Sequence, residues 1–164
     1  HARLGIAEEN SGRLVTQVRN RASRLADTLE HGLILGDGPP GTGCPVIASV
    51  SGTDLVVIVT EPTVSGVHDM ERVMNLARHF GVRAVVIINK ADLNIQQAER
   101  IEEISRAHGS RVIGRIPFDR AVNDALMAGK SVIEYGSGNA EKAMRDAWEE
   151  LRKEKETINT GGSE

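Results

Sequence analysis

Four short segments rich in aliphatic and β-branched residues recur along the chain, and a longer stretch with the apolar period of a helix follows each of them. They are residues 33–35, 55–60, 84–89 and 112–116. Strands that alternate with helices at this spacing indicate βαβ units and a mostly parallel sheet. The middle two segments are continuous apolar runs, which is typical of strands that helices cover on both faces. The sequence therefore predicts an α/β fold, a mostly parallel β-sheet with helices on both faces and these two strands at its centre.

The helical stretches are bounded by recognisable capping residues. The first carries an apolar stripe over residues 14–29 and is expected to pack on the sheet. Two later helices are expected to begin at Thr63 and Asn94, because short polar side chains cap helix N-termini. They are expected to stop at Gly81 and Gly109, since glycine favours the conformation that ends a helix.

A short helix over residues 119–128 and a last one over 139–153 complete the predicted elements. The residues beyond Glu154 are polar and have no apolar period. We therefore expect a folded domain over residues 1–154 and a flexible tail over 155–164.

Composition and charge narrow the function classes. The chain has 20 Lys and Arg residues against 23 Asp and Glu residues, so its net charge of -3 gives no drive toward nucleic acid or an anionic membrane. No apolar run approaches the roughly 20 residues that a membrane span needs. The single Cys44 cannot by itself build an iron–sulfur or zinc site, and we expect it to be a small residue buried beside a turn. A cytoplasmic protein without a membrane span or a nucleic-acid partner is the expected class.

A segment rich in glycine and proline, DGPPGTGCP at 37–45, follows the first predicted strand. It begins like a Walker A phosphate loop, but Cys44 and Pro45 replace the Lys and the Ser or Thr that this loop needs. One interpretation is that Asp37, at the tip of a strand, holds Mg²⁺ through water as the carboxylates of P-loop nucleotide hydrolases do. The alternative, of equal weight, is that Asp37 caps a short helix near Val46 and that the segment forms a tight turn.

The segment Asn89-Lys-Ala-Asp92 follows the third predicted strand. A side-chain amide at a strand end can both donate to and accept from the edge of a purine base. A carboxylate three residues later would accept from the N–H groups of guanine, and the pattern matches the NKxD motif of GTPases. The alternative is a turn that caps the following helix.

The other two strand ends carry less specific signals. Pro117 ends the fourth strand and could place Phe118 and nearby backbone groups beside a base. We favour the simpler interpretation, in which Asp119 is the N-cap of the next helix. After the second strand, capping by Thr63 or Ser65 accounts for the polar residues.

Taken in order, these motifs resemble the MinD/ParA/Mrp class of P-loop ATPases. The resemblance is closest to the subgroup that carries a ferredoxin domain inserted after the first βα unit, whose members are often described as cobyrinic acid a,c-diamide synthase-like. It covers nearly the whole chain. The matching segments are EENSGRLVTQVR at 8–19, DGPPGTGCPVIAS at 37–49, TEPTVSGVHDMERV at 60–73, VVIINKADLN at 85–94 and IPFD at 116–119.

The resemblance implies roles for two groups of residues. Asp37 would organise Mg²⁺ and the attacking water, and Gly41, with Thr42 beside it, would contact the γ-phosphate. Four residues would bind the rest of the nucleotide. Asn89 would read adenine, Pro117 and Phe118 would flank the base, and Asp92 would belong to the same group. Pro40 stands where the D-x-x-G motif of guanine-nucleotide proteins needs glycine, so ATP is favoured over GTP despite Asp92.

The family's phosphate loop with two lysines and the cysteines of the ferredoxin insert do not occur in these 164 residues. The resemblance therefore implies the C-terminal portion of a longer MinD/ParA-like nucleotide-binding domain, an incomplete P-loop NTPase fold. The intact protein is expected to be a homodimeric hydrolase that uses ATP and Mg²⁺. Iron–sulfur clusters in the missing insert would couple hydrolysis to electron transfer or metallocofactor assembly with a redox or assembly partner. This portion alone is expected to be inactive.

Two other function classes remain open. The chain could be a degenerate nucleotide-fold module that acts as a scaffold for protein interactions. It could also be a GTPase-like switch, which Asn89 and Asp92 favour.

Overall fold

A computed structural model describes residues 11–41 and 43–160. The chain divides into two compact units, His1–Thr53 and Asp54–Glu164. Within the described residues, no helix is both long enough and apolar enough to cross a membrane.

The first unit contains α1 (Ser11–Thr28) and α2 (Cys44–Val50), which pack against each other. Arg19 of α1 joins them, because its guanidinium donates to the carbonyl oxygens of Ala48 (2.8 Å), Ser51 and Gly52 (2.9 Å) at the end of α2. The last carbonyls of a helix lack partners within the helix, so this side chain satisfies groups that would otherwise need water. The predicted first helix is confirmed, and its packing on the sheet stays a prediction.

The segment 33–35 differs from its prediction. These residues form no strand, and all three side chains are exposed, Leu35 to 75%. A strand needs a neighbour for its backbone N–H and C=O groups, and no described strand pairs with this segment. The prediction of a buried strand here is therefore wrong. Cys44 is also exposed, at the first position of α2, so its predicted burial is wrong as well.

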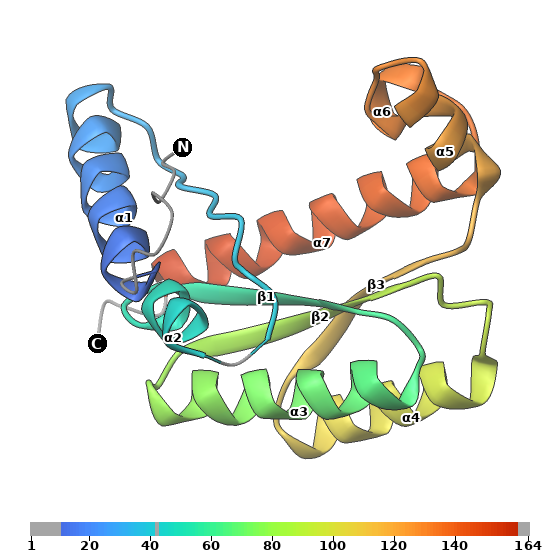
Figure 1. The fold of residues 1–164 in the computed structure, drawn as a ribbon, viewed down its shortest axis with the longest axis horizontal. Coiled ribbons are helices and arrows are strands. Elements are labelled where there is room, and N and C mark those ends of the chain that lie inside the picture. The colour runs from blue at the N-terminus through green and yellow to red at the C-terminus, as the bar shows by residue number, and fades with distance from the viewer. Residues whose placement is uncertain (1–10, 42, 161–164) are drawn as a thin grey trace. The chain divides into compact units, whose positions relative to one another are not determined.

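The second unit is built on a three-stranded parallel sheet in the order β1 (Leu55–Thr60), β2 (Arg83–Asn89) and β3 (Arg111–Ile116), as Figure 1 shows. The register pairs Thr60 with Ile88 and, beyond an irregularity after Val86, Asn89 with Ile116. The prediction that 84–89 is central is confirmed. The same prediction for 55–60 is wrong here, because β1 lies at the edge among the described strands and Val59 is 63% exposed.

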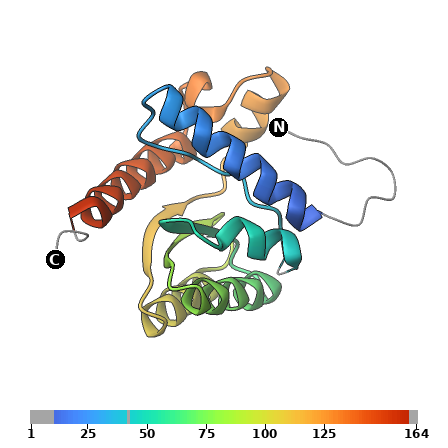
Figure 2. The same cartoon turned by 90° about the vertical axis from the view of Figure 1, so that its left-hand side faces the viewer.

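Helices cover both faces of this sheet, as predicted. α3 (Val64–His79) and α4 (Ile95–Ala107) lie against one face and α7 (Asn139–Thr160) against the other (Figures 1 and 2). The core lies between the sheet and helices α3 and α4. Removal of its aliphatic surface from water stabilises the unit. Its buried residues are Ile58, Val67, Met70, Met74, Val86, Ile88, Ala91, Ala98 and Ile101.

The predicted caps are in place. Thr63 accepts from the Gly66 N–H at the start of α3, and Asn94 accepts from the Gln97 N–H at the start of α4. Gly81 (φ +66°) and Gly109 (φ +72°) follow the ends of the same helices in the left-handed conformation that glycine adopts without strain.

Two short helices connect β3 to α7. α5 (Arg120–Met127) begins at the predicted cap Asp119. α6 (Val132–Tyr135) was not predicted, because four residues are too few to show an apolar period. Its signal in the sequence is the capping box of Ser131 and Glu134, whose side chains each accept from the other residue's backbone N–H.

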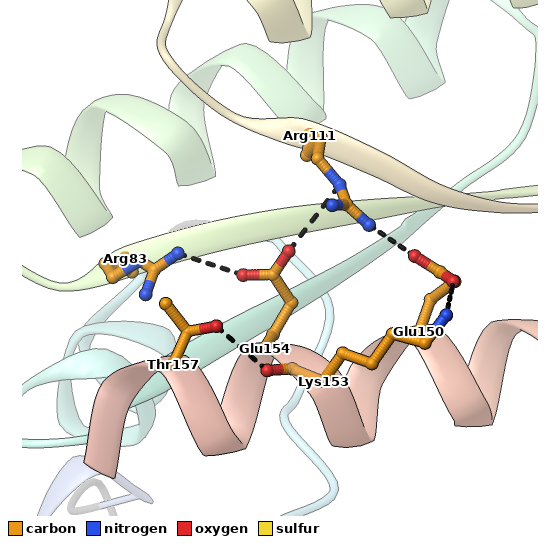
Figure 3. Close-up of polar contacts among 6 residues, drawn as sticks. All are labelled: Arg83, Arg111, Glu150, Lys153, Glu154 and Thr157. Atoms are coloured by element: carbon orange, nitrogen blue, oxygen red, sulfur yellow. Dashed lines mark hydrogen bonds and ion pairs between the residues drawn. The ribbon is translucent and has the colours of Figure 1, made fainter. Parts of the chain in front are cut away.

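The last helix is longer than predicted. Regular structure was expected to end near residue 154, yet α7 continues to Thr160. Glu154 is buried and lies 2.9 Å from Arg83 Nη2 and 3.5 Å from Arg111 Nε, so α7 is held against the sheet close to its end (Figure 3). Residues 155–160 are therefore helical, and residues 161–164 lie outside the described part of the chain.

Candidate functional site

The carboxyl ends of the three strands bring three loops to one edge of the sheet. In open α/β sheets ligands bind at this edge. Asn89 is the last residue of β2, and Asp92 lies in the loop that follows it. Pro117 and Phe118 directly follow β3. The structure therefore places these four predicted site residues at the same edge.

Two hydrogen bonds join the loop after β2 to the loop after β3. The Ala91 N–H donates to the Ile116 carbonyl oxygen (2.9 Å), and the Phe118 N–H donates to Asp92 Oδ1 (2.6 Å). Asp92 thus fixes the Phe118 backbone while the Phe118 side chain stays 52% exposed. The alternative that the Asn89–Asp92 turn caps the following helix is not what the structure shows, since Asn94 caps α4.

Glu61, directly after β1, belongs to this edge and was missed in the sequence. Its Oε1 lies 2.7 Å from Lys90 Nζ and accepts from Asn89 Nδ2 at 3.5 Å. Its place beside Asn89 follows from the strand register, which pairs Thr60 with Ile88. The sequence alone did not supply that alignment of the two strands, so it carried no signal for Glu61.

The turn between β1 and α3 fixes the Glu61 backbone. The Thr63 N–H donates to the Glu61 carbonyl oxygen (2.8 Å), and the buried Thr60 hydroxyl donates to the Gly66 carbonyl oxygen (2.9 Å). A Cβ on Gly66 would collide with the Glu61 carbonyl oxygen, so only glycine allows this approach. Of the two predicted capping residues, Thr63 is the cap, and the Ser65 hydroxyl lies 3.3 Å from the Thr63 hydroxyl.

Asp119 has a structural role, as the favoured interpretation predicted. Its Oδ1 accepts from the Ala121 N–H (2.9 Å), and its Oδ2 accepts from the Ala140 N–H (3.1 Å). The hydrogen bond from Ala121, and then the one from Ala140, lowers the pKa of this carboxyl below its usual value. One carboxylate thereby fixes the starts of both α5 and α7.

Asp37 and Gly41 belong to the first unit. Asp37 is exposed and precedes Gly41, which has a φ of +90°. The N-cap of α2 is Gly43, without a side-chain hydrogen bond, so the alternative that Asp37 caps this helix is wrong. Thr42 lies outside the described residues. That Asp37 acts on Mg²⁺ and Gly41 on a phosphate stays a prediction.

The residues at the carboxyl edge of the sheet carry groups that suit a purine base. The chain carries fewer groups that suit the phosphates of a nucleotide. Asn89 is half-buried, and its Oδ1 accepts no hydrogen bond from any described residue. An amide oxygen so placed and an exposed aromatic ring are groups that bind bases by hydrogen bonding and stacking. In the segment 38–45, Cys44 and Pro45 supply neither the positive charge nor the hydroxyl of a phosphate loop.

Metal binding by protein groups alone has little support in the described parts of the chain. Over residues 11–41 and 43–160, no three His, Cys, Asp or Glu side chains gather where they could hold a metal ion. Mg²⁺ usually keeps several waters and binds one or two carboxylates together with substrate phosphates. A single carboxylate such as Asp37 fits only that kind of site.

A second polar cluster lies at the opposite, amino-terminal edge of the sheet (Figure 3). It borders a hollow of about 330 Å³ whose lining includes Arg83, Arg106, Arg111 and Glu154. Glu154 forms ion pairs with both Arg83 and Arg111, and Arg111 also lies 2.5 Å from Glu150. Contacts to Lys153 first, and then to Arg111, lower the pKa of Glu150. These pairs hold α7 to the sheet, so the cluster is structural.

Two curated proteins of Methanocaldococcus jannaschii match the chain, and no protein-family model does. The uncharacterized protein MJ0578 is 29% identical over 149 residues, which are 91% of this chain and 49% of that protein. The uncharacterized protein MJ0579 is 23% identical over 130 residues, which are 79% of this chain and 42% of that protein. The chain therefore spans about half the length of the curated relatives it matches.

Solved structures of MinD proteins share the fold. The MinD cell division protein of Aquifex aeolicus aligns with a TM-score of 0.70 and 24% identity, over 84% of this chain and 60% of that one. MinD of Pyrococcus horikoshii, solved in complex with Mg-ADP, aligns with a TM-score of 0.69 and 18% identity, over 90% of this chain and 59% of that one. The fold is thus the α/β fold of MinD-type P-loop NTPases. These matches give no support to the ferredoxin-containing or cobyrinic acid synthase-like subgroup.

Proposed function

We propose that this chain supplies the base-binding part of a MinD-like ATPase that binds ATP with Mg²⁺ and hydrolyses it. The observation that carries the proposal is the unpartnered Oδ1 of Asn89 at the same sheet edge as the exposed Phe118. The shared fold supports it, and so does the structural neighbour from Pyrococcus horikoshii, which was solved with Mg-ADP.

Each base-binding residue has a distinct role in this proposal. Asn89 hydrogen-bonds the purine edge, and Pro117 and Phe118 flank its ring. Asp92 acts indirectly, because its Oδ1 accepts from the Phe118 N–H and so holds the aromatic residue in place. In a guanine-binding site this carboxylate would instead accept from the base. Pro40 also stands where the D-x-x-G motif of guanine-nucleotide proteins needs glycine, so ATP is favoured over GTP and the GTPase-like switch is the less supported candidate.

The phosphate end of the proposal depends on Asp37, Gly41 and Thr42. Asp37 would hold Mg²⁺ through water and orient the attacking water, while Gly41 and Thr42 would contact the γ-phosphate. Mg²⁺ would neutralise the charge that develops on the phosphates. Since the family's phosphate loop with its two lysines does not occur in these 164 residues, we expect them alone to be inactive. Phosphate release by the purified chain would contradict this.

The finer assignments rest on the sequence resemblance alone. They are homodimerisation, coupling of hydrolysis to iron–sulfur clusters in another part of the protein, and a redox or cofactor-assembly partner. A scaffold for protein interactions is the alternative if no nucleotide binds.

Removal of the Asn89 side-chain amide tests the proposed function. We expect Asn89→Ala to weaken ATP binding by roughly tenfold, because one to two hydrogen bonds of about 1 kcal/mol each are lost. Calorimetric titration of the protein at its natural length gives the affinity. Asn75→Ala is the matched control, since Asn75 is exposed on α3. Equal affinities of the Asn89→Ala and Asn75→Ala variants would contradict the proposal.

A further inference from the structure

The orientation of the Asn89 amide is set by Glu61. Asn89 Nδ2 lies 3.5 Å from Glu61 Oε1, and an ionised carboxylate can only accept hydrogen bonds. The amide must therefore turn its NH₂ group toward Glu61, because its oxygen would be repelled there. The two ends of a side-chain amide are assigned by their hydrogen-bond partners, and this partner allows one assignment. Oδ1 is left as the end that can meet a ligand.

The Glu61 carboxylate is itself held in place. The Thr63 N–H fixes its backbone carbonyl (2.8 Å), and Lys90 Nζ holds Oε1 from the neighbouring strand end (2.7 Å). Lys90 has a φ of +52°, a conformation that non-glycine residues seldom adopt and that is often found at functional sites. The pair also neutralises the carboxylate charge, so a negatively charged nucleotide meets less repulsion at this edge.

We propose that Glu61 is a positioning residue that makes the site specific for 6-amino purines. This inference rests on the proposed function. Adenine carries an NH₂ donor at position 6, whereas guanine carries a carbonyl acceptor there. With Nδ2 committed to Glu61, Asn89 presents an acceptor, which binds the 6-amino group of adenine and repels the 6-oxo group of guanine. The preference for adenine over guanine then depends on the orientation of the Asn89 side-chain amide.

Glu61→Gln tests this without removing the Asn89 side chain. A glutamine amide can donate as well as accept, so Asn89 would face the ligand with either end. We expect the ratio of the GTP to the ATP dissociation constant to fall about tenfold, the equivalent of one hydrogen bond, in the protein at its natural length. Glu99→Gln is the matched control, because Glu99 is exposed on α4 and its side chain makes no hydrogen bond or ion pair with a described residue.

The NMR signals of the Asn89 side-chain NH₂ group give a second readout that needs no nucleotide. They are assigned by their loss in Asn89→Ala. We expect them to shift between the wild-type protein and Glu61→Gln, and to stay unchanged in Glu99→Gln.

The outcomes separate this inference from the proposed function. If the wild-type protein binds neither ATP nor GTP, the proposed function fails and the inference with it. If the wild-type protein prefers ATP and Glu61→Gln keeps the same preference, the inference is overturned while the proposed function stands. Loss of the preference in Glu61→Gln alone supports both.

Discussion

Asp119 uses both of its carboxylate oxygens to fix backbone groups. The hydrogen bonds from Ala121 and Ala140 favour the ionised carboxyl, and they lower its pKa below the usual 3.8. A pKa that is lower in the folded than in the unfolded protein contributes stability that is complete above the unfolded value. That stability is lost as the pH falls through the folded value.

The pH dependence of unfolding measures this contribution. Between about pH 7 and about pH 3 we expect the wild-type protein to lose more stability than Asp119→Asn, because the asparagine has no carboxyl group to protonate. The urea midpoint at the two pH values gives the loss. Asp124→Asn is the control, since Asp124 is exposed on α5. If Asp119→Asn and Asp124→Asn lose stability equally in acid, the account of Asp119 is wrong.

Single residues were predicted from the sequence where their partners are local. Thr63, Asn94 and Asp119 each cap a helix that begins one residue later, so the cap and the apolar period lie in one short window. Glu61 was missed because its partner Asn89 is on another strand. Its role follows from strand register, which is a property of the folded sheet.

At the scale of elements, the contact of β3 with α7 depends on Gly114. A Cβ built on Gly114 would lie 2.7 Å from the Cβ of Ala147, closer than two non-bonded carbon atoms approach in proteins. The strand and the helix can therefore pack at this distance only without a side chain at position 114. Ala147 is buried at the contact, so the helix cannot relieve the clash without moving.

A double-mutant cycle tests this packing. We expect Gly114→Ala to lower the free energy of unfolding by about 1–3 kcal/mol, the usual cost of overpacking. Ala147→Gly should make room for the new methyl group. The loss in the double variant should then be smaller than the sum of the single losses, by at least about 1 kcal/mol. Urea unfolding of the four proteins gives these values, and additive losses would contradict the packing described.

Elements were predicted well where their own sequence determines them. The three strands of the sheet and the helices that follow them lie within a few residues of their predicted positions. Residues 33–35 were predicted as a strand from composition, yet a strand also needs a neighbour, and no described strand pairs with them. The far end of α7 was missed for a related reason, since Glu154 is held by Arg83 and Arg111 from distant strands.

For the whole molecule, the sequence predicted the class of fold better than it predicted the functional site. The α/β architecture follows from alternating strand and helix patterns, and the MinD structures share it. The residues predicted to bind a base follow from motifs at strand ends, and they do gather at one edge of the sheet. That Asp37 and Gly41 act on the same nucleotide stays a prediction, because it rests on the sequence resemblance.

The central claim is that an adenine nucleotide binds at the carboxyl edge of the sheet. Mapping ATP-induced shifts in the ¹H–¹⁵N NMR spectrum of the protein at its natural length tests it most directly. In the second unit, we predict the largest shifts at the Asn89 side chain and the Phe118 N–H. Shifts concentrated instead at Arg83, Ser110 and Arg111, around the hollow at the opposite edge, would contradict the claim, and so would a spectrum that ATP leaves unchanged.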